Sequence, residues 1–224
     1  MTVVAQRLVL FDLDGTLVNS APDIAHAANS ALGDLGLPPI TFAQVRSFIG
    51  NGAERLIHRC LTNDLNGDAP AALHREAYAS FQAHYQLCLC DRTRLYPGVS
   101  ETLSALLEGG LTMGCVTNKP ARFTAPLLRA LELEHFFAIT VAGDTLPHKK
   151  PAPEPLLYAI AHVGTTAEST VMVGDSLADL RAARAAGAHA YCVDYGYADQ
   201  LELISHGPDA MLGNFPELLP LLLG

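Results

Sequence analysis

Short apolar runs that end at polar or glycine residues recur along this chain, and longer stretches with helical periodicity separate most of them. Runs of this length are typical of strands that are buried on both faces of a sheet. Strands that alternate with helices predict a parallel sheet covered by helices on both sides, with ligands bound beyond the carboxyl ends of the strands. The expected strands are Arg7 to Phe11, Thr112 to Val116, Ile139 to Ala142, Thr170 to Val173 and Ala190 to Val193.

The first two of these runs lie much farther apart than a single crossover helix requires. Residues 18–94 carry apolar side chains at helical spacing and contain no evident strand. Within them, Thr41 and Gln44 have the spacing of a helix capping box. We therefore predict an all-helical domain of residues 18–94, inserted into an α/β core of residues 1–17 and 95–224.

The composition limits the classes of protein to which the chain can belong. Half of its 224 residues are hydrophobic and 17% are charged, as in a compact folded protein. Its net charge of −9 at pH 7 argues against binding to nucleic acid or to anionic membranes, since both need basic patches. The five cysteines match neither a zinc pattern nor a disulfide framework, and no apolar stretch reaches about 18 residues. We expect a cytoplasmic protein with no nucleic-acid or membrane partner.

The first expected strand leads directly into two carboxylates, Asp12 and Asp14, followed by Gly15 and Thr16. The alternation of side chains along a strand puts both carboxylates on one side. Two like charges held so close repel each other, unless a cation lies between them or one of them is protonated. The spacing thus predicts a metal site or a shared proton, and the alternative is an ordinary turn at the end of a strand.

Three later positions add groups of complementary chemistry at the ends of expected strands or in loops before helices. Each has an ordinary structural explanation by itself, such as a helix cap or a solvated lysine. Together with the two aspartates they could supply a nucleophile, an acid, phosphate donors, a cation and metal ligands, which is what phosphoryl transfer needs. The added residues are Thr117 with Asn118, Lys150, and Asp175 with Asp179.

Because these residues occur in this order and combination, the chain resembles phosphatases of the haloacid dehalogenase superfamily, in the phosphoglycolate phosphatase branch. The resemblance covers essentially the whole chain and implies a Rossmann-like, doubly wound, mostly parallel sheet with a helical cap inserted after the first motif. Closure of the cap is a further hypothesis, based on the two connecting segments near Val18 to Ala21 and Arg92 to Pro97, which could act as hinges. The four family motifs match Asp12-Leu13-Asp14-Gly15-Thr16, Thr117, Lys150, and Gly174-Asp175-Ser176 with Asp179.

The resemblance also implies roles for these residues. Asp12 would attack phosphorus and form an aspartyl phosphate, and Asp14 would act as general acid and then as general base. Thr117, Asn118 and Lys150 would hold the phosphoryl oxygens, and Lys150 is preferred to Lys149 because the family's lysine directly precedes a proline. A Mg²⁺ ion would be held by Asp12, the backbone carbonyl of Asp14, Asp175 and Asp179.

Weaker similarities point to the substrate. The segments Gly50-Asn51-Gly52-Ala53, Thr117 to Pro120 and Gly143 to Pro147 resemble phosphoglycolate phosphatases, which implies hydrolysis of 2-phosphoglycolate to glycolate and phosphate. The carboxylate of such a substrate needs a cation or hydrogen-bond donors, and the candidates are Asn51, Gly52 and Arg55. The expected partner is a small phosphorylated metabolite, and the expected state is a monomer or a homodimer.

Several alternatives remain open at this point. A phosphatase of the same mechanism could act on a sugar or amino-sugar phosphate, a nucleotide or pyrophosphate. A phosphomutase similar to beta-phosphoglucomutase shares the core chemistry, whereas a dehalogenase has no need of Asp14 as an acid. From a different class, the chain could be a non-catalytic module that binds a phosphorylated ligand or a protein. Replacement of Asp12 separates the last alternative from the enzymes, because a binding module would keep its affinity.

Overall fold

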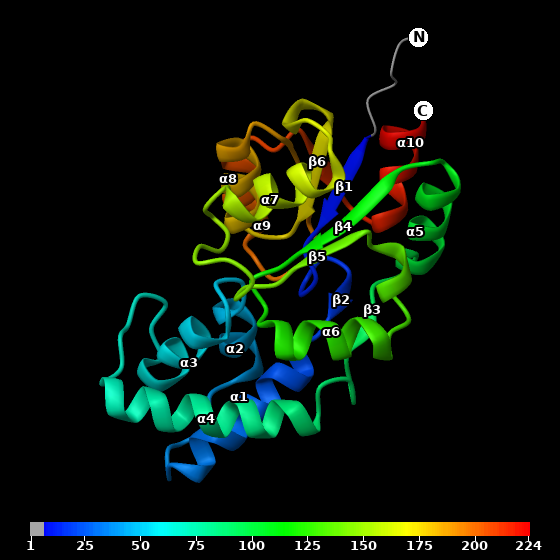
Figure 1. Ribbon diagram of the computed structural model, residues 1–224. Coiled ribbons are helices and arrows are strands. Elements are labelled where there is room, and N and C mark those ends of the chain that lie inside the picture. The colour runs from blue at the N-terminus through cyan, green and yellow to red at the C-terminus, as the bar shows by residue number, and fades with distance from the viewer. Residues whose placement is uncertain (1–6) are drawn as a thin grey trace.

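A computed structural model describes residues 7–224 of the chain, and its centre is a six-stranded sheet (Figure 1). The strand order is β5-β4-β1-β6-β7-β8, and every neighbouring pair is parallel. The first strand therefore lies in the middle of the sheet, where the flanking strands bury it. The strands are β1 (Leu8–Phe11), β4 (Thr112–Val116), β5 (Ile139–Val141), β6 (Thr170–Gly174), β7 (His189–Val193) and β8 (Ala210–Leu212).

Helices cover both faces of this sheet, which confirms the predicted α/β, doubly wound fold (Figure 1). Alternate residues of β1 face opposite layers: Val9 and Phe11 pack with α5, α6 and α10, while Leu8 and Leu10 pack with α7, α8 and α9. Both sides of β1 are apolar because both are buried. The helices of this part are α5 (Val99–Glu108), α6 (Ala121–Ala130), α7 (Glu154–Val163), α8 (Leu177–Ala186), α9 (Gln200–Ser205) and α10 (Leu218–Leu223), with 3₁₀ turns η1 (Glu134–Phe136), η2 (Ala167–Ser169) and η3 (Phe215–Glu217).

Five of the six strands follow the sequence prediction to within about one residue, whereas β8 was not predicted. It has only three residues, Ala210–Leu212, and two of them are partly exposed. So short a run has no periodicity of its own, and β8 exists because it pairs with Tyr191 to Val193 of β7.

The segment predicted to be helical forms four helices with a core of their own (Figure 1). In that core α1 packs along α4, and Phe123 of α6 belongs to the same cluster, so the helices rest against the rest of the molecule. Thr41 and Gln44 form the predicted capping box at the start of α2. The helices are α1 (Ala21–Asp34), α2 (Phe42–Phe48), α3 (Ala53–Thr62) and α4 (Ala71–Leu87).

The two segments that connect these helices to the sheet pair with each other. β2 (Val18–Asn19) and β3 (Arg94–Leu95) form a two-stranded antiparallel ladder, so residues 18–94 are not wholly without strands as the sequence suggested. The ladder lies within both predicted hinge segments and joins them. The division into a domain of residues 18–94 and a core stays a prediction. Within residues 7–224, no helix combines the length and the hydropathy that crossing a membrane requires.

Candidate active site

Asp12 stands at the carboxyl end of the central strand, where the parallel sheet directs its polar groups. Its backbone N–H donates to the carbonyl of Val173 at 2.9 Å, which continues the pairing of β1 with β6. Its side chain is buried, and Asp14 follows on the loop that leads to β2. The central position of β1 thus places a carboxylate where groups from the neighbouring strands can surround it.

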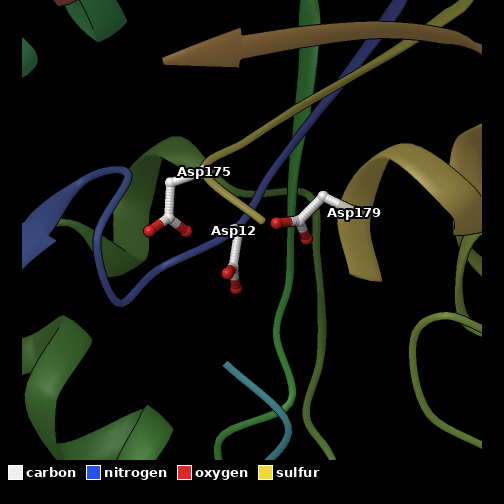
Figure 2. Close-up of side chains that lie close together, drawn as sticks. All are labelled: Asp12, Asp175 and Asp179. Atoms are coloured by element: carbon white, nitrogen blue, oxygen red, sulfur yellow. The ribbon is translucent and has the colours of Figure 1, made fainter. Parts of the chain in front are cut away.

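Three buried carboxylates meet at this point (Figure 2). Asp12 follows β1, Asp175 follows β6, and Asp179 lies in the first turn of α8. One oxygen from each lies within 4.8 Å of the others. Asp175 and Asp179 are brought there because β6 ends next to β1 and α8 begins directly after it.

Lys150 is a buried ammonium in contact with two of these carboxylates. Its Nζ lies 3.0 Å from Oδ1 of Asp12 and donates to Oδ1 of Asp179 at 2.6 Å and to the carbonyl of Val116 at 2.5 Å. Burial alone would lower the pKa of Lys150, but the facing Asp12 and Asp179 outweigh it and raise that pKa. Lys150 therefore carries a positive charge, which offsets part of the negative charge of the site.

One ammonium does not balance three carboxylates. Burial raises the pKa of Asp12 to about 6, and Asp179 adds to this while Lys150 works against it. Burial, with Asp12 and Asp179 beside it, also raises the pKa of Asp175 well above its usual range. Lys150 lies 3.0 Å from Oδ1 of Asp12, but this buried oxygen accepts no hydrogen bond from the described residues. A divalent cation that prefers oxygen ligands, such as Mg²⁺, fits this cluster. It would balance the negative charge of the carboxylates and be coordinated by the oxygen of Asp12 that accepts no hydrogen bond.

The other contacts of Asp175 and Asp179 fix the orientation of their carboxylates. Oδ2 of Asp175 accepts the backbone N–H of Tyr197 at 2.6 Å, and Oδ1 accepts the hydroxyl of Thr16 at 3.5 Å. Oδ2 of Asp179 accepts the N–H and hydroxyl of Ser176 at 3.0 and 2.6 Å, in a capping box. Gly15 has a φ of +89°, and a Cβ there would lie 2.2 Å from Asp175, so this turn requires glycine.

Thr117 and Asn118 lie at the end of β4 on the opposite side of Asp12. Both are buried, and Thr117 lines a cavity together with Asp12 and Asp14. The side-chain amide of Asn118 donates to the carbonyls of Gly50 at 3.0 Å and Lys150 at 2.9 Å. That side chain thus links the end of β4 to the turn before α3 and to the lysine loop.

The cavity lies between the sheet edge and the helices, and its volume is about 40 Å³. The predicted substrate residues reach it unequally: Gly52 lines it, whereas Asn51 and Arg55 do not. Asn51 accepts a hydrogen bond from Arg59 at 2.9 Å, and Arg55 turns outward to Asp68 at 2.5 Å. The structure therefore brings together the predicted residues of the sheet edge but leaves Asn51 and Arg55 outside the cavity. The cavity is lined by Asp12, Asp14, Ile24, Ile49, Gly50, Gly52, Ala53, Leu56, Phe81, Tyr85, Thr117, Asn118, Lys119, Pro120 and Phe123.

Three residues that are not among the predicted site residues form a hydrogen-bonded network with the side chain of Asp14. Nζ of Lys119 lies 3.0 and 3.1 Å from the two oxygens of Asp14 and donates to the hydroxyl of Tyr85 at 2.6 Å. The hydroxyl of Ser20 donates to Oδ1 of Asp14 at 2.5 Å. Lys119 lies within the segment Thr117 to Pro120, and the similarity of that segment to phosphoglycolate phosphatases is the local signal that could have found it.

Comparisons with known proteins identify the family to which the chain belongs. The family model for "Haloacid dehalogenase-like hydrolase" matches residues 9–193, and the chain belongs to this family. It is an enzyme, a phosphatase.

Named relatives agree with this assignment. A "Phosphoglycolate phosphatase" from Nitrosospira multiformis is 45% identical over 96% of this chain and 95% of its own. Another of that name from Nitrosococcus oceani is 42% identical over 96% of both chains. A crystal structure of a predicted phosphoglycolate phosphatase from Haemophilus somnus is 34% identical and superposes with a TM-score of 0.89, covering 98% of this chain and 99% of the other.

Proposed function

We propose that this phosphatase is a Mg²⁺-dependent enzyme that hydrolyses 2-phosphoglycolate to glycolate and phosphate. The observation that carries the proposal is the arrangement around Asp12, which faces the buried Lys150 on one side and two further carboxylates on the other. The names of the relatives support the choice of substrate.

In this proposal a carboxylate oxygen of Asp12 attacks phosphorus, and the bond from phosphorus to the glycolate oxygen breaks. Asp14 gives a proton to that leaving oxygen, and the product of the step is an aspartyl phosphate. Asp14 then takes a proton from the water that attacks phosphorus, which releases phosphate and regenerates Asp12. Both aspartates line the same cavity, which supports their joint action.

Thr117, Asn118 and Lys150 would hold the phosphoryl oxygens through a hydroxyl, a backbone amide and an ammonium. The carboxylates of Asp12, Asp175 and Asp179, with the carbonyl of Asp14, would hold the magnesium ion. When bound, the ion supplies positive charge against the phosphoryl oxygens. The hydrogen bonds from Tyr197 and Ser176 hold the carboxylates of Asp175 and Asp179 in the orientation for this task.

The partner is a small phosphorylated metabolite, and the enzyme works in the cytoplasm as a monomer or homodimer. Residues 18–94 act as a cap over the site, since Gly52, Leu56 and Phe81 of this segment line the cavity opposite Asp12.

The test is phosphate release, with and without Mg²⁺, from 2-phosphoglycolate and from hexose phosphates, amino-sugar phosphates, nucleotides and pyrophosphate. We expect 2-phosphoglycolate to have the highest kcat/KM and the activity to need Mg²⁺. Asp12→Asn serves as the blank and should release no phosphate. Another leading ester would refute the substrate while leaving the phosphatase mechanism in place. Conversion of a sugar phosphate that depends on glucose 1,6-bisphosphate would instead indicate a phosphomutase.

A further inference from the structure

The cavity beside Asp12 contains one ammonium group that the proposed chemistry does not use. Among the described residues that line the cavity, Lys119 is the one with a cationic side chain. That side chain is only 3% exposed, and it extends from the segment after β4. A buried cation that opens on a cavity is a natural partner for an anionic ligand.

One of the present hydrogen-bond acceptors of Lys119 can be replaced during the reaction. Lys150 donates hydrogen bonds to Val116 and Asp179, lies 3.0 Å from Oδ1 of Asp12, and does not line the cavity. Lys119 instead has both oxygens of Asp14 and the hydroxyl of Tyr85. Under the proposed function Asp14 must turn one oxygen toward the leaving group, and a donor of Lys119 then needs another acceptor.

The carboxylate of the proposed substrate can be that acceptor. In 2-phosphoglycolate a single carbon separates the ester oxygen from the carboxylate, so the groups that contact these two parts must be immediate neighbours. The Nζ of Lys119 lies 3.0 Å from Oδ1 of Asp14, the proposed acid at the ester oxygen. Arg55 is directed at Asp68, away from the cavity, and cannot fill this role in this arrangement.

We infer that Lys119 binds the carboxylate of the substrate and thereby selects phosphomonoesters that carry an anionic group one carbon from the ester oxygen. This inference rests on the proposed function and deepens it.

The apolar walls of the cavity explain why a contact with Lys119 distinguishes esters that carry a carboxylate from esters that do not. Apolar side chains line the same cavity as Lys119, and the Nζ of Lys119 lies 4.7 Å from the centre of the Tyr85 ring. An ester without a second anionic group would draw Asp14 away and offer Lys119 no acceptor in return, which is costly in a largely apolar cavity. A carboxylate restores the lost charge pair. The apolar residues of the wall are Ile24, Ile49, Ala53, Leu56, Phe81, Pro120 and Phe123.

The experiment compares 2-phosphoglycolate with ethyl phosphate, in which a methyl group replaces the carboxylate. For each enzyme the measured quantity is the ratio of kcat/KM for the two esters. Lys119→Met should lower this ratio about 10- to 100-fold, the usual effect of losing a charged hydrogen bond. Arg122→Met removes a cation outside the cavity on α6, and Arg55→Met removes the outward arginine; both should leave the ratio unchanged.

An unchanged ratio in a folded Lys119→Met enzyme would overturn the inference, because Lys119 would then act only on Asp14 and slow both esters equally. A ratio that falls in Arg55→Met and not in Lys119→Met would overturn it as well. Lys119→Gln, which keeps a neutral donor of similar length, provides the same comparison if the methionine variant does not fold.

If the wild-type enzyme releases phosphate from other esters but not from 2-phosphoglycolate, the proposed substrate fails and the inference fails with it. Turnover of 2-phosphoglycolate with an unchanged ratio defeats the inference alone.

Discussion

Asp23 and Thr93, which are 70 positions apart in the chain, are joined by two hydrogen bonds to one oxygen. Oδ2 of Asp23 accepts the backbone N–H of Thr93 at 2.8 Å and its hydroxyl at 2.7 Å. Both carboxylate oxygens also accept the N–H of Arg92 at 3.0 Å. Both Asp23 and Thr93 are buried, so this contact fastens the first turn of α1 to the segment that leads into β3.

Removal of this carboxylate should destabilise the protein. Asp23→Ala would leave the buried donors of Thr93 and the partly buried N–H of Arg92 without their acceptor, and we expect the free energy of unfolding to fall by about 3 kcal/mol. Urea unfolding followed by circular dichroism measures the change. Asp91→Ala, an exposed aspartate in the same connection, is the matched control and should change stability by less than about 0.5 kcal/mol. Equal stability of the two variants would contradict the structural role of Asp23.

Lys150 should matter for stability as well as for catalysis. Lys150→Met leaves Asp12 and Asp179 buried without their cation, and breaking a buried ion pair in this way costs about 3–5 kcal/mol. The measurement is thermal unfolding in EDTA, so that no metal compensates. The neighbouring Lys149 is half-buried, and Lys149→Met should cost less than about 1 kcal/mol. Similar losses from the two substitutions would argue against a special role for Lys150.

A divalent cation should stabilise the fold through the acidic cluster. We expect Mg²⁺ to raise Tm in a saturable way, because a ligand that binds only the folded state adds about 2.7 kcal/mol at a concentration of 100 times Kd. Asp175→Asn removes one carboxylate of the cluster and should weaken this response at least about tenfold in concentration. Asp91→Asn is the charge-matched control and should respond like the wild type. A response to Mg²⁺ that survives in Asp175→Asn would place the metal elsewhere.

The helical segment should contain a pH-sensitive contact at His58. Its Nδ1 accepts the backbone N–H of Ala69 at 3.1 Å, and its ring stacks on His74 with centroids 3.7 Å apart. Burial and the neighbouring His74 lower the pKa of His58, so the folded state holds it neutral at pH values where the unfolded chain is already protonated. Its contribution to stability is therefore complete above the unfolded pKa of about 6.5 and is lost as the pH falls through the lower folded value.

This contribution is measured by comparing the urea unfolding of the wild type and His58→Gln at about pH 7.5 and about pH 5. The stability difference between the two proteins should be larger at the higher pH. His162→Gln, an exposed histidine on α7, should show no such pH dependence. A difference that grows toward low pH would mean that His58 is held in its charged form.

The sequence alone predicted those features whose signal is local or follows from the topology of the sheet. The capping box of Thr41 and Gln44 needs only two residues three positions apart, and the structure contains it. The meeting of Asp12, Thr117 and Asp175 at one edge follows once the strands are parallel, because their carboxyl ends then share that edge.

Other features depend on partners that are distant in the chain. β8 has three residues and exists only through its neighbour β7. The ladder of β2 with β3 needs both connecting segments at once. No pattern around Asp23 indicates that Thr93 will be its donor.

By itself, the sequence determined the alternation of strands and helices and the polar residues at the strand ends, since these depend on periodicity and on neighbours within a few positions. Only the tertiary structure decided how side chains of the helical segment meet the site: Tyr85 reaches Lys119, whereas Arg55 turns to Asp68. The physical reason is that the direction of a long side chain is set by the nearest available counter-charge or acceptor, and packing between distant segments determines which one that is.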